Sequence, residues 1–280
     1  MKNIINKFFK KIIRFVLKSK FANKSIINVI LSKGYIVRKN FTYEELQERS
    51  MIIPLDQCTS WHGFGYGNNG WNPFVELIRE YQNNPNITFN ESVLKRFYDK
   101  FDLIKYHSMI CNNNDESYLD TWPIIHFWYL PENIAEENKI SYNIYFGLNE
   151  REQEVQHQST IDTYKSIKQN GYKPELFTNR SVRDGFINVV LLKKGKTYRY
   201  LITNGQHRIA ALSALNYKYI SATFEPIIQF MPSVIDLDNI ENFPIVKHKI
   251  ISRECVVKIF SPLFKDFGRE KAIKIGVIPK

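Results

Sequence analysis

A pattern of strand, tight turn, strand, helix and strand between residues 184 and 225 constrains the fold of this chain most strongly. Two runs rich in β-branched and aromatic residues flank the sequence Lys-Lys-Gly-Lys, which is typical of a hairpin turn. An Asn-Gly pair then leads into an alanine- and leucine-rich helix, and Asn216 marks the turn into a further strand. A helix within 159–174, ended by Gly171, completes the pattern. This order of elements predicts a compact α/β module.

The rest of the chain is expected to be mainly helical, which makes the whole an α/β (α+β) protein. Residues 59–74 are rich in glycine, asparagine and aromatic side chains; we expect a structural loop there, with a sugar-stacking or nucleotide-covering loop as the alternative. Three regions follow: a basic helical segment at 1–40, a mainly helical region with aromatic loops at 41–150, and the α/β module with a carboxy-terminal helix at 151–280. Helices outside the module core are expected over residues 25–37, 41–51, 73–83, 90–101 and 252–267.

Positive charge is concentrated at the amino-terminal end. The net charge is +11, and residues 1–40 contain eleven basic residues and no acidic one. The remainder of the chain holds 28 basic and 28 acidic residues and is therefore neutral. A nucleic-acid-binding domain carries its charge on the folded body, near the elements that read the nucleic acid. The charge distribution therefore disfavours nucleic-acid binding.

The basic segment is also amphipathic. Its apolar residues recur in pairs every four positions, at Ile4/Ile5, Phe8/Phe9, Ile12/Ile13 and Val16/Leu17, and basic side chains fill the other face. Such a helix suits the surface of an anionic membrane, where the apolar face enters the headgroup boundary. We therefore expect residues 1–20 to contact such a surface. The alternative is a helix packed on the protein body with a solvated lysine face.

Several features predict a cytoplasmic protein that is peripheral to the inner face of the cell membrane. No apolar run reaches the ~18 residues that a membrane span needs. The apolar positions at the start are broken up by lysines, and no small-residue cleavage site follows them. Cys58, Cys111 and Cys255 are too few and too far apart for a disulfide framework or a zinc cluster.

Two short motifs lie on either side of the hairpin. The first is a helix end marked by Ser166, Ile167, Gly171 and Pro174. The second is Gly-Gln-His-Arg at 205–208, which opens the alanine-rich helix. Their arrangement over about residues 155–225 resembles the ParB/sulfiredoxin-like superfamily. The resemblance implies a site for nucleotide phosphates, which holds CTP in ParB, ATP in sulfiredoxin, and ATP or ADP in ParB-like free-serine kinases.

The chemistry of the second motif fits a phosphate independently of the resemblance. Gly205 lets the backbone approach a ligand closely, and the first N–H groups of the helix favour negative charge there. Arg208 can fork onto two phosphate oxygens, and His207 can donate a hydrogen bond or shuttle a proton. Asn204 and Gln206 complete the expected nucleotide-binding set. The alternative is a helix terminus at which the Arg and His side chains form structural salt bridges.

Departures from the superfamily narrow the expected function. Sulfiredoxin carries a reactive cysteine directly before its His-Arg pair, and here that position is Gln206. ParB proteins continue into a helix-turn-helix DNA domain, of which the sequence after residue 225 shows no sign. The kinase branch remains, because it needs only a phosphate site, Mg²⁺ and a carboxylate base.

Candidate catalytic residues lie before the hairpin. The kinase relatives use a glutamate ahead of the Ser-Ile helix, and from residues 149–162 we select Glu154 and Asp162, together with His207. Asp184 is a further candidate for a base or a Mg²⁺ ligand, and Arg180 for phosphate positioning. The histidines at 62, 107, 126 and 248 are scattered without metal-ligand spacing, so they are assigned no role. Other side chains of the same segments are Glu150, Glu152, His157 and Arg183.

These observations lead to one functional expectation and two alternatives. The first is a nucleotide-dependent phosphotransferase, using ATP or ADP or else CTP with Mg²⁺, that acts on a hydroxyl of a small molecule or glycan. Segments 71–84, 91–101, 122–130 and 251–264 are similar to a group of bacterial proteins associated with surface-polysaccharide gene clusters, which implies a role in envelope metabolism. The first alternative is a non-catalytic nucleotide-binding scaffold at the membrane surface. The second is a nucleic-acid-binding ParB-like protein.

Overall fold

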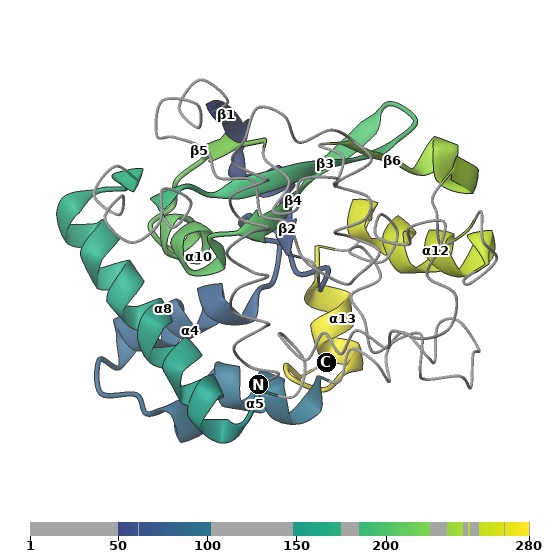
Figure 1. Ribbon diagram of the computed structural model, residues 1–280. Helices are drawn as coiled ribbons and strands as arrows, with labels where there is room; N and C mark the ends of the chain where they lie inside the picture. Colours follow the sequence, from purple (N-terminus) through teal and green to yellow (C-terminus); the bar gives the residue numbers. More distant parts are fainter. Residues whose placement is uncertain are drawn as a thin grey trace, which may run out of the picture.

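The computed structural model describes residues 50–60, 62–101, 148–174, 185–224, 234–242, 246, 252–265 and 267–279 (Figure 1). This part of the chain forms an α/β fold with a mixed sheet of six strands. The strands are β1 (Ser50–Pro54), β2 (Cys58–Ser60), β3 (Asn188–Lys194), β4 (Thr197–Asn204), β5 (Tyr219–Thr223) and β6 (Val234–Asp236). The helices are α4 (Pro73–Asn83), α5 (Val93–Lys100), α8 (Glu150–Asn170), α10 (Gln206–Ala214), α12 (Arg253–Phe260) and α13 (Arg269–Lys274).

The predicted hairpin and the helix after it form the centre of the fold. Strands β3 and β4 pair antiparallel, and the Gly195-Lys196 turn joins them. The sheet runs in the order β1-β5-β3-β4-β2, with β6 beside β3. Strand β1 pairs antiparallel with β5, whereas β2 pairs parallel with β4. The expected order of helix, strand, strand, helix and strand is confirmed by α8, β3, β4, α10 and β5.

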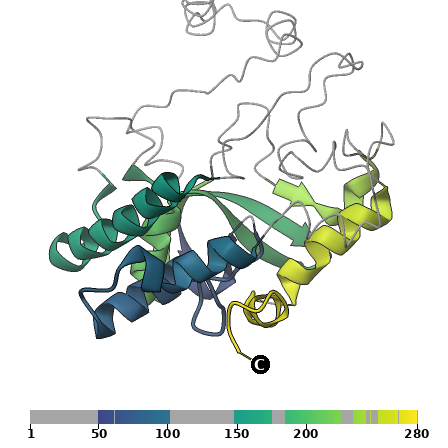
Figure 2. The same cartoon turned by 90° about the horizontal axis from the view of Figure 1, so that it is seen from below.

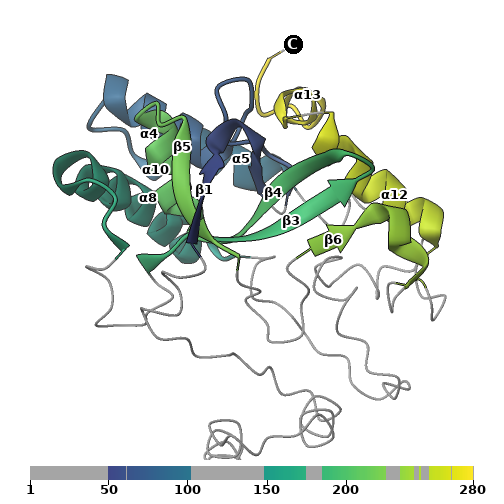
Figure 3. The ribbon, with the colours of Figure 1, turned by 90° about the horizontal axis from the view of Figure 1, so that it is seen from above.

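The sheet is strongly curled, because a short connection joins its two edge strands. Only Leu55–Gln57 separates β1 from β2. At about 3.5 Å per residue this connection spans at most roughly 14 Å. Four strand-to-strand steps of about 4.8 Å would place the edges of a flat sheet roughly 19 Å apart. The β1–β5 pair accordingly turns away from the β3–β4 hairpin (Figure 3).

Three helices cover one side of the sheet. Helices α4, α8 and α10 pack against one another on this side (Figures 2 and 3). Helix α10 is buried from Ile209 to Ala214, and its alanines allow close approach to the strands. The core between helices and sheet includes Val189, Ile202 and Ile220 from the strands and Leu77 and Ile78 from α4.

The two strands contributed by residues 50–60 differ from the sequence expectation. Ser50 and Met51 were expected at the end of a helix over 41–51, and they belong to β1. Both strands join the sheet formed mainly by residues beyond 150, so one sheet draws on both sides of that position. The segments are short, and β2 carries no apolar alternation, so their pairing with distant strands decides their structure.

Helix boundaries differ in two further places. Helix α8 begins at Glu150 rather than near residue 159, because Asn149 and Glu152 form a capping box at 3.0 and 2.9 Å. The helix expected over 252–267 is shorter. Helix α12 ends at Phe260, and a 3₁₀ turn containing Pro262 follows it.

Several expectations concern parts of the chain outside the described residues. They are the amphipathic helix at 1–20, the helix at 25–37, and the positions Arg180, Arg183 and Asp184. Among the described helices, none has the length and apolar character needed to cross a membrane.

Candidate functional site

A cavity of about 400 Å³ lies at the sheet edge where α10 begins. Strands β2 and β4 are parallel, so their carboxyl ends meet at this edge, and the chain leaves each of them toward a helix that starts nearby. Such an edge is a common place for a ligand in α/β proteins. The lining residues are Ser60, His62, Phe64, Asn72, Pro73, Phe74, Phe97, Tyr98, Leu148, Gln156, Thr163, and 203–208.

A chain of side-chain amides fixes the start of α10 to the sheet. Asn188 at the start of β3 donates from Nδ2 to Thr223 Oγ1 of β5 at 2.7 Å. Asn204 Nδ2 donates to Asn188 Oδ1 at 3.2 Å, and Asn204 Oδ1 accepts from the Gly205 N–H at 2.8 Å. The ends of three strands and the first turn of α10 are therefore held together by one network.

Gly205 itself is required by the backbone at this junction. It is the N-cap of α10 and has a left-handed conformation with φ of 87°. A Cβ at this position would lie 3.1 Å from Ile187 Cγ1 and 3.2 Å from Ile187 Cα. The tight junction brings the first turn of α10 to the wall of the cavity.

The amino termini of α4 and α10 differ in side-chain capping among the described residues. At α4 the Asn72 side chain accepts from the Phe74 N–H at 3.0 Å, and Pro73 has no N–H. At α10 no side chain of the described residues caps the first turn. The helix dipole favours an anion at this terminus, where no described side chain competes for the position of a cap.

Thr203 supplies an independent indication of a ligand. Its side chain is only 5% exposed and lines the cavity. Its Oγ1 has no hydrogen-bond partner among the described residues. A buried hydroxyl without a hydrogen-bond partner costs about 1–3 kcal/mol of stability. A ligand that forms a hydrogen bond with the Thr203 hydroxyl would remove this cost, which would favour its binding.

His207 connects α10 to α8. Its Nδ1 lies 2.7 Å from Thr160 Oγ1, its Nε2 lies 3.0 Å from Gln156 Oε1, and the Phe74 ring packs edge-on at 5.0 Å. Burial, with a smaller effect of the neighbouring Arg208 charge, lowers the pKa of His207 to about 4. The imidazole is therefore neutral at pH 7, and both ring nitrogens are engaged by α8. This geometry favours a role in positioning the first turn of α10.

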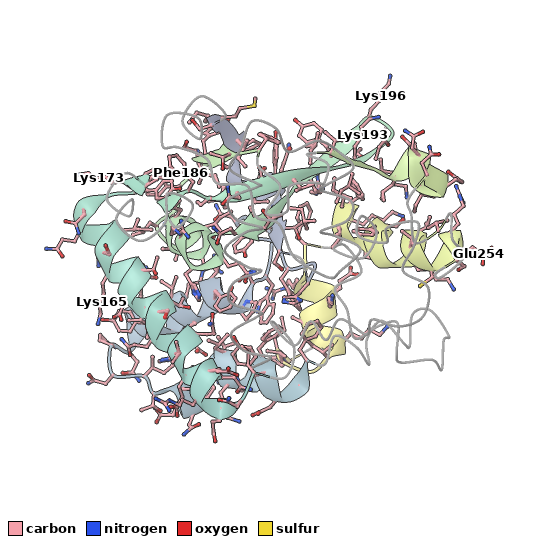
Figure 4. The ribbon with its side chains drawn as sticks, in the orientation of Figure 1. Lys165, Lys173, Phe186, Lys193, Lys196 and Glu254 are labelled. Atoms are coloured by element: carbon pink, nitrogen blue, oxygen red, sulfur yellow. The ribbon has the colours of Figure 1, made fainter. Side chains whose placement is uncertain are left out.

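Arg208 is anchored to the approach to β3. Its Nη1 donates to the Phe186 carbonyl at 2.9 Å. Figure 4 shows Phe186 at the end of β3 that adjoins α10. Arg208 also lines the cavity, so a fixed positive charge stands beside the open end of the helix.

The selected carboxylates of α8 do not reach the cavity. Glu154 and Asp162 are exposed, and Asp162 accepts from Gln158 Nε2 at 2.9 Å. Lys165 marks the same solvent-facing side of the helix in Figure 4. Gln156 and Thr163 are the α8 side chains that line the cavity.

The other polar residues named on α8 also lie outside the cavity lining. Glu152 belongs to the capping box, and Glu150 is exposed in the first turn. His157 is buried edge-on against Phe89 at 5.9 Å, and burial lowers its pKa. Within the described ranges, no group of three or more His, Cys, Asp or Glu side chains is arranged to hold a metal ion.

The loop after β2 forms one wall of the cavity. Its rings Phe64, Tyr66 and Trp71 are buried in the core. The carboxy-terminal segment holds this loop in place, because the Gly65 and Trp71 N–H groups both donate to the Phe267 carbonyl, at 3.0 and 2.9 Å.

The sequence located the cavity residues 204–208, and the loop 59–74, for which a nucleotide-covering role was the alternative, also contributes to the lining. The remaining lining residues were not identified. Thr203 lies within a predicted strand and carries no motif. The aromatic side chains of α4 and α5 reach the cavity only because α4 packs against α10 and α5 packs against α4. No local signal identifies them, since their spacing is that of ordinary core positions.

No protein-family model matches the chain, and comparisons with curated proteins and with solved structures gave no significant match.

Proposed function

We propose that this protein binds a nucleotide through its phosphates at the start of α10 and transfers a phosphoryl group to a hydroxyl acceptor. The observation that carries the proposal is the buried Thr203 hydroxyl, which has no hydrogen-bond partner among the described residues and lies beside a first turn of α10 that none of their side chains caps. A phosphate accepts hydrogen bonds from hydroxyl and amide donors alike, and it carries the negative charge that the helix dipole favours.

The described lining of the cavity is neutral or basic. Arg208 provides a fixed positive charge, and Asn204 and Gln206 add neutral polar groups. A carboxylate in such a lining would repel phosphates, and none is contributed by the described residues. These features support phosphate binding, as does the order of elements that resembles a ParB/sulfiredoxin-like module.

Transfer would move the terminal phosphoryl group from the nucleotide to the acceptor oxygen, while a base takes the hydroxyl proton. The described residues contribute positioning and charge neutralisation to this step. They do not themselves form a Mg²⁺ site, so a bound Mg²⁺ would be held mainly by the phosphates and would neutralise their charge. Asp184 is our candidate for the base, since it lies two residues before Phe186 in the sequence.

The cellular setting that we propose follows from the sequence. The basic amphipathic segment 1–20 would hold the enzyme at an anionic membrane surface on the cytoplasmic side. The acceptor would then be a small molecule or glycan of envelope or surface-polysaccharide synthesis.

The main alternative is a nucleotide-binding scaffold without turnover. One observation favours it: the carboxylates Glu154 and Asp162 face solvent. In this case the cavity would bind a nucleotide, and the acceptor hydroxyl would have no base from α8.

The first experiment measures thermal stabilisation of the full chain by ATP, ADP and CTP, each with and without Mg²⁺. We expect an increase in Tm with at least one nucleotide, which Arg208→Ala and Thr203→Val abolish or reduce. Arg253→Ala is the matched control, because Arg253 forms an exposed ion pair with Glu241 away from the cavity. No increase with any nucleotide would refute phosphate binding.

A second experiment separates transfer from binding. Nucleotide consumption is measured with candidate hydroxyl acceptors for the wild type, Asp184→Asn, Glu154→Gln and Asp162→Asn. We expect Asp184→Asn alone to lose turnover and to keep the nucleotide-dependent increase in Tm. Binding without consumption in the wild type would favour the scaffold.

A further inference from the structure

The cavity lining combines two kinds of side chain. Residues 203–208 supply polar groups at the start of α10. Phe74 from α4, and Phe97 and Tyr98 from α5, supply aromatic rings. Neither α4 nor α5 belongs to the segment 155–225 that carries the phosphate motif.

We infer that Tyr98 and the neighbouring rings hold the base of the bound nucleotide, so that the ligand of this cavity is a nucleoside phosphate and not a sugar phosphate or an inorganic polyphosphate. This inference rests on the proposed phosphate site. It assigns a binding site to the base, which the phosphate site does not contact.

Tyr98 is the ring best placed to meet a ligand. Phe97 is buried, stacks on Phe101 at 5.0 Å and meets Phe64 edge-on at 5.4 Å. Phe74 is also buried, against His207. Tyr98 is only partly buried, at 5.7 Å from Phe97, and it lines the cavity.

The environment of Tyr98 suits a flat, apolar partner. Burial raises the pKa of the Tyr98 phenol, so the ring stays neutral across the physiological range. Nucleobases stack on such aromatic faces with little dependence on sequence, because every base has a π face.

The size and composition of the cavity agree with such a ligand. A volume of about 400 Å³ lies within the range of small-molecule sites, which combine aromatic walls with a few polar groups that fix orientation. Here the charged and polar groups of residues 204–208 share the lining with the rings of α4 and α5. The ligand should therefore present charge to the start of α10 and a flat ring to Tyr98.

The test compares ATP with inorganic tripolyphosphate, which has the phosphates without the nucleoside, and AMP with ribose 5-phosphate. Dissociation constants are measured by calorimetry on the full chain for the wild type, Tyr98→Ala and Tyr98→Phe. Tyr217→Ala is the control, because Tyr217 is an exposed tyrosine in the turn before β5.

We expect the wild type to bind ATP at least about 10-fold more tightly than tripolyphosphate, and AMP more tightly than ribose 5-phosphate. Tyr98→Ala should weaken ATP binding about 10-fold and leave tripolyphosphate binding unchanged. Tyr98→Phe and Tyr217→Ala should bind ATP as the wild type does. If Tyr98→Ala fails to fold, the wild-type comparison and Tyr98→Phe still decide the question.

Equal affinity of the wild type for ATP and tripolyphosphate would overturn the base site and leave the phosphate site standing. Ribose 5-phosphate binding as tightly as AMP would also overturn it, in favour of a sugar phosphate. Binding of neither ATP nor tripolyphosphate would instead refute the proposed function. An equal loss of both ligands in Tyr98→Ala would show that Tyr98 acts only on the phosphate end, which also overturns the inference.

Discussion

Replacement of Gly205 by alanine tests whether the junction between β4 and α10 is as tight as the structure shows. The backbone φ of 87° is left-handed, and an L side chain there costs about 1–2 kcal/mol. The new Cβ would also lie 3.1 and 3.2 Å from two atoms of Ile187, one of which is backbone. Overpacking of this kind costs about 1–3 kcal/mol. We therefore expect Gly205→Ala to lower the free energy of unfolding by about 3 kcal/mol.

Gly276→Ala is the matched control for the backbone contribution. Gly276 follows α13 with φ of 74°, and its N–H and that of Val277 make the paired hydrogen bonds that end a helix at a left-handed glycine. A Cβ there would meet only Lys100 Nζ, at 3.7 Å. This variant should therefore lose only about 1 kcal/mol, the strain of the left-handed backbone.

Urea unfolding of both variants checks the difference. With a slope of about 3 kcal/mol per molar urea, the midpoint should fall by about 1 M for Gly205→Ala and by about 0.3 M for Gly276→Ala. Equal midpoints would refute the reasoning, because they would mean that the close approach to Ile187 costs nothing.

Three further predictions concern titration, a buried hydrogen bond and a surface ion pair. The pKa of His207 is lowered from 6.5 to about 4 in the folded state, so between these pH values the unfolded chain binds more protons than the folded chain. The stability contributed by the neutral His207 is therefore complete above pH 6.5 and is lost as the pH falls toward 4. Urea unfolding should show the wild type losing roughly 3 kcal/mol more than His207→Gln between pH 7 and pH 4. Ser213→Ala should lower the free energy of unfolding by about 2 kcal/mol, since the buried Ser213 hydroxyl donates to the Tyr66 carbonyl. Lys193→Ala should shift Tm by less than about 2 °C, because the ion pair of Lys193 with Asp236 is only partly buried and is screened by solvent.

Each of these predictions has a result that contradicts it. Parallel pH profiles for the wild type and His207→Gln would show that His207 does not titrate abnormally. A Ser213→Ala variant as stable as the wild type would mean that the Tyr66 carbonyl finds another donor. A large loss of Tm in Lys193→Ala would show that the hairpin end, where Figure 4 places Lys193 and Lys196, is more tightly held than its exposure suggests.

The elements with strong local signals were predictable from the sequence. The start of α4 follows from Asn72-Pro73, where the side-chain cap and a residue without an N–H agree with a helix beginning. The hairpin follows from two β-rich runs around a glycine turn, and α5 from Ser92, which caps its first turn. In each case neighbouring residues alone decide the conformation.

The elements that depend on distant partners were not predictable. Strand β2 is three residues long, and its conformation is fixed by pairing with residues 200–202. The early part of α8 is polar on most sides, so hydrophobic periodicity does not reveal it, although the Asn149–Glu152 capping box does. The same distinction holds for the candidate site, since residues 204–208 carry a motif, whereas Tyr98 and Thr203 become neighbours of that motif only through tertiary packing.

The three-residue link between β1 and β2 also sets an order of events during synthesis. Both strands leave the ribosome early, yet Ser50 pairs with Thr223 and Ser60 with Ile202. At about 5–20 residues per second, these partners follow on the order of 10 s later. Until then an apolar stretch that includes Ile53 and Leu55 has no strand to pair with. The nascent chain therefore passes through a long interval in which its two future sheet edges are open to mispairing or to chaperones, and sheet closure must be a late step of folding.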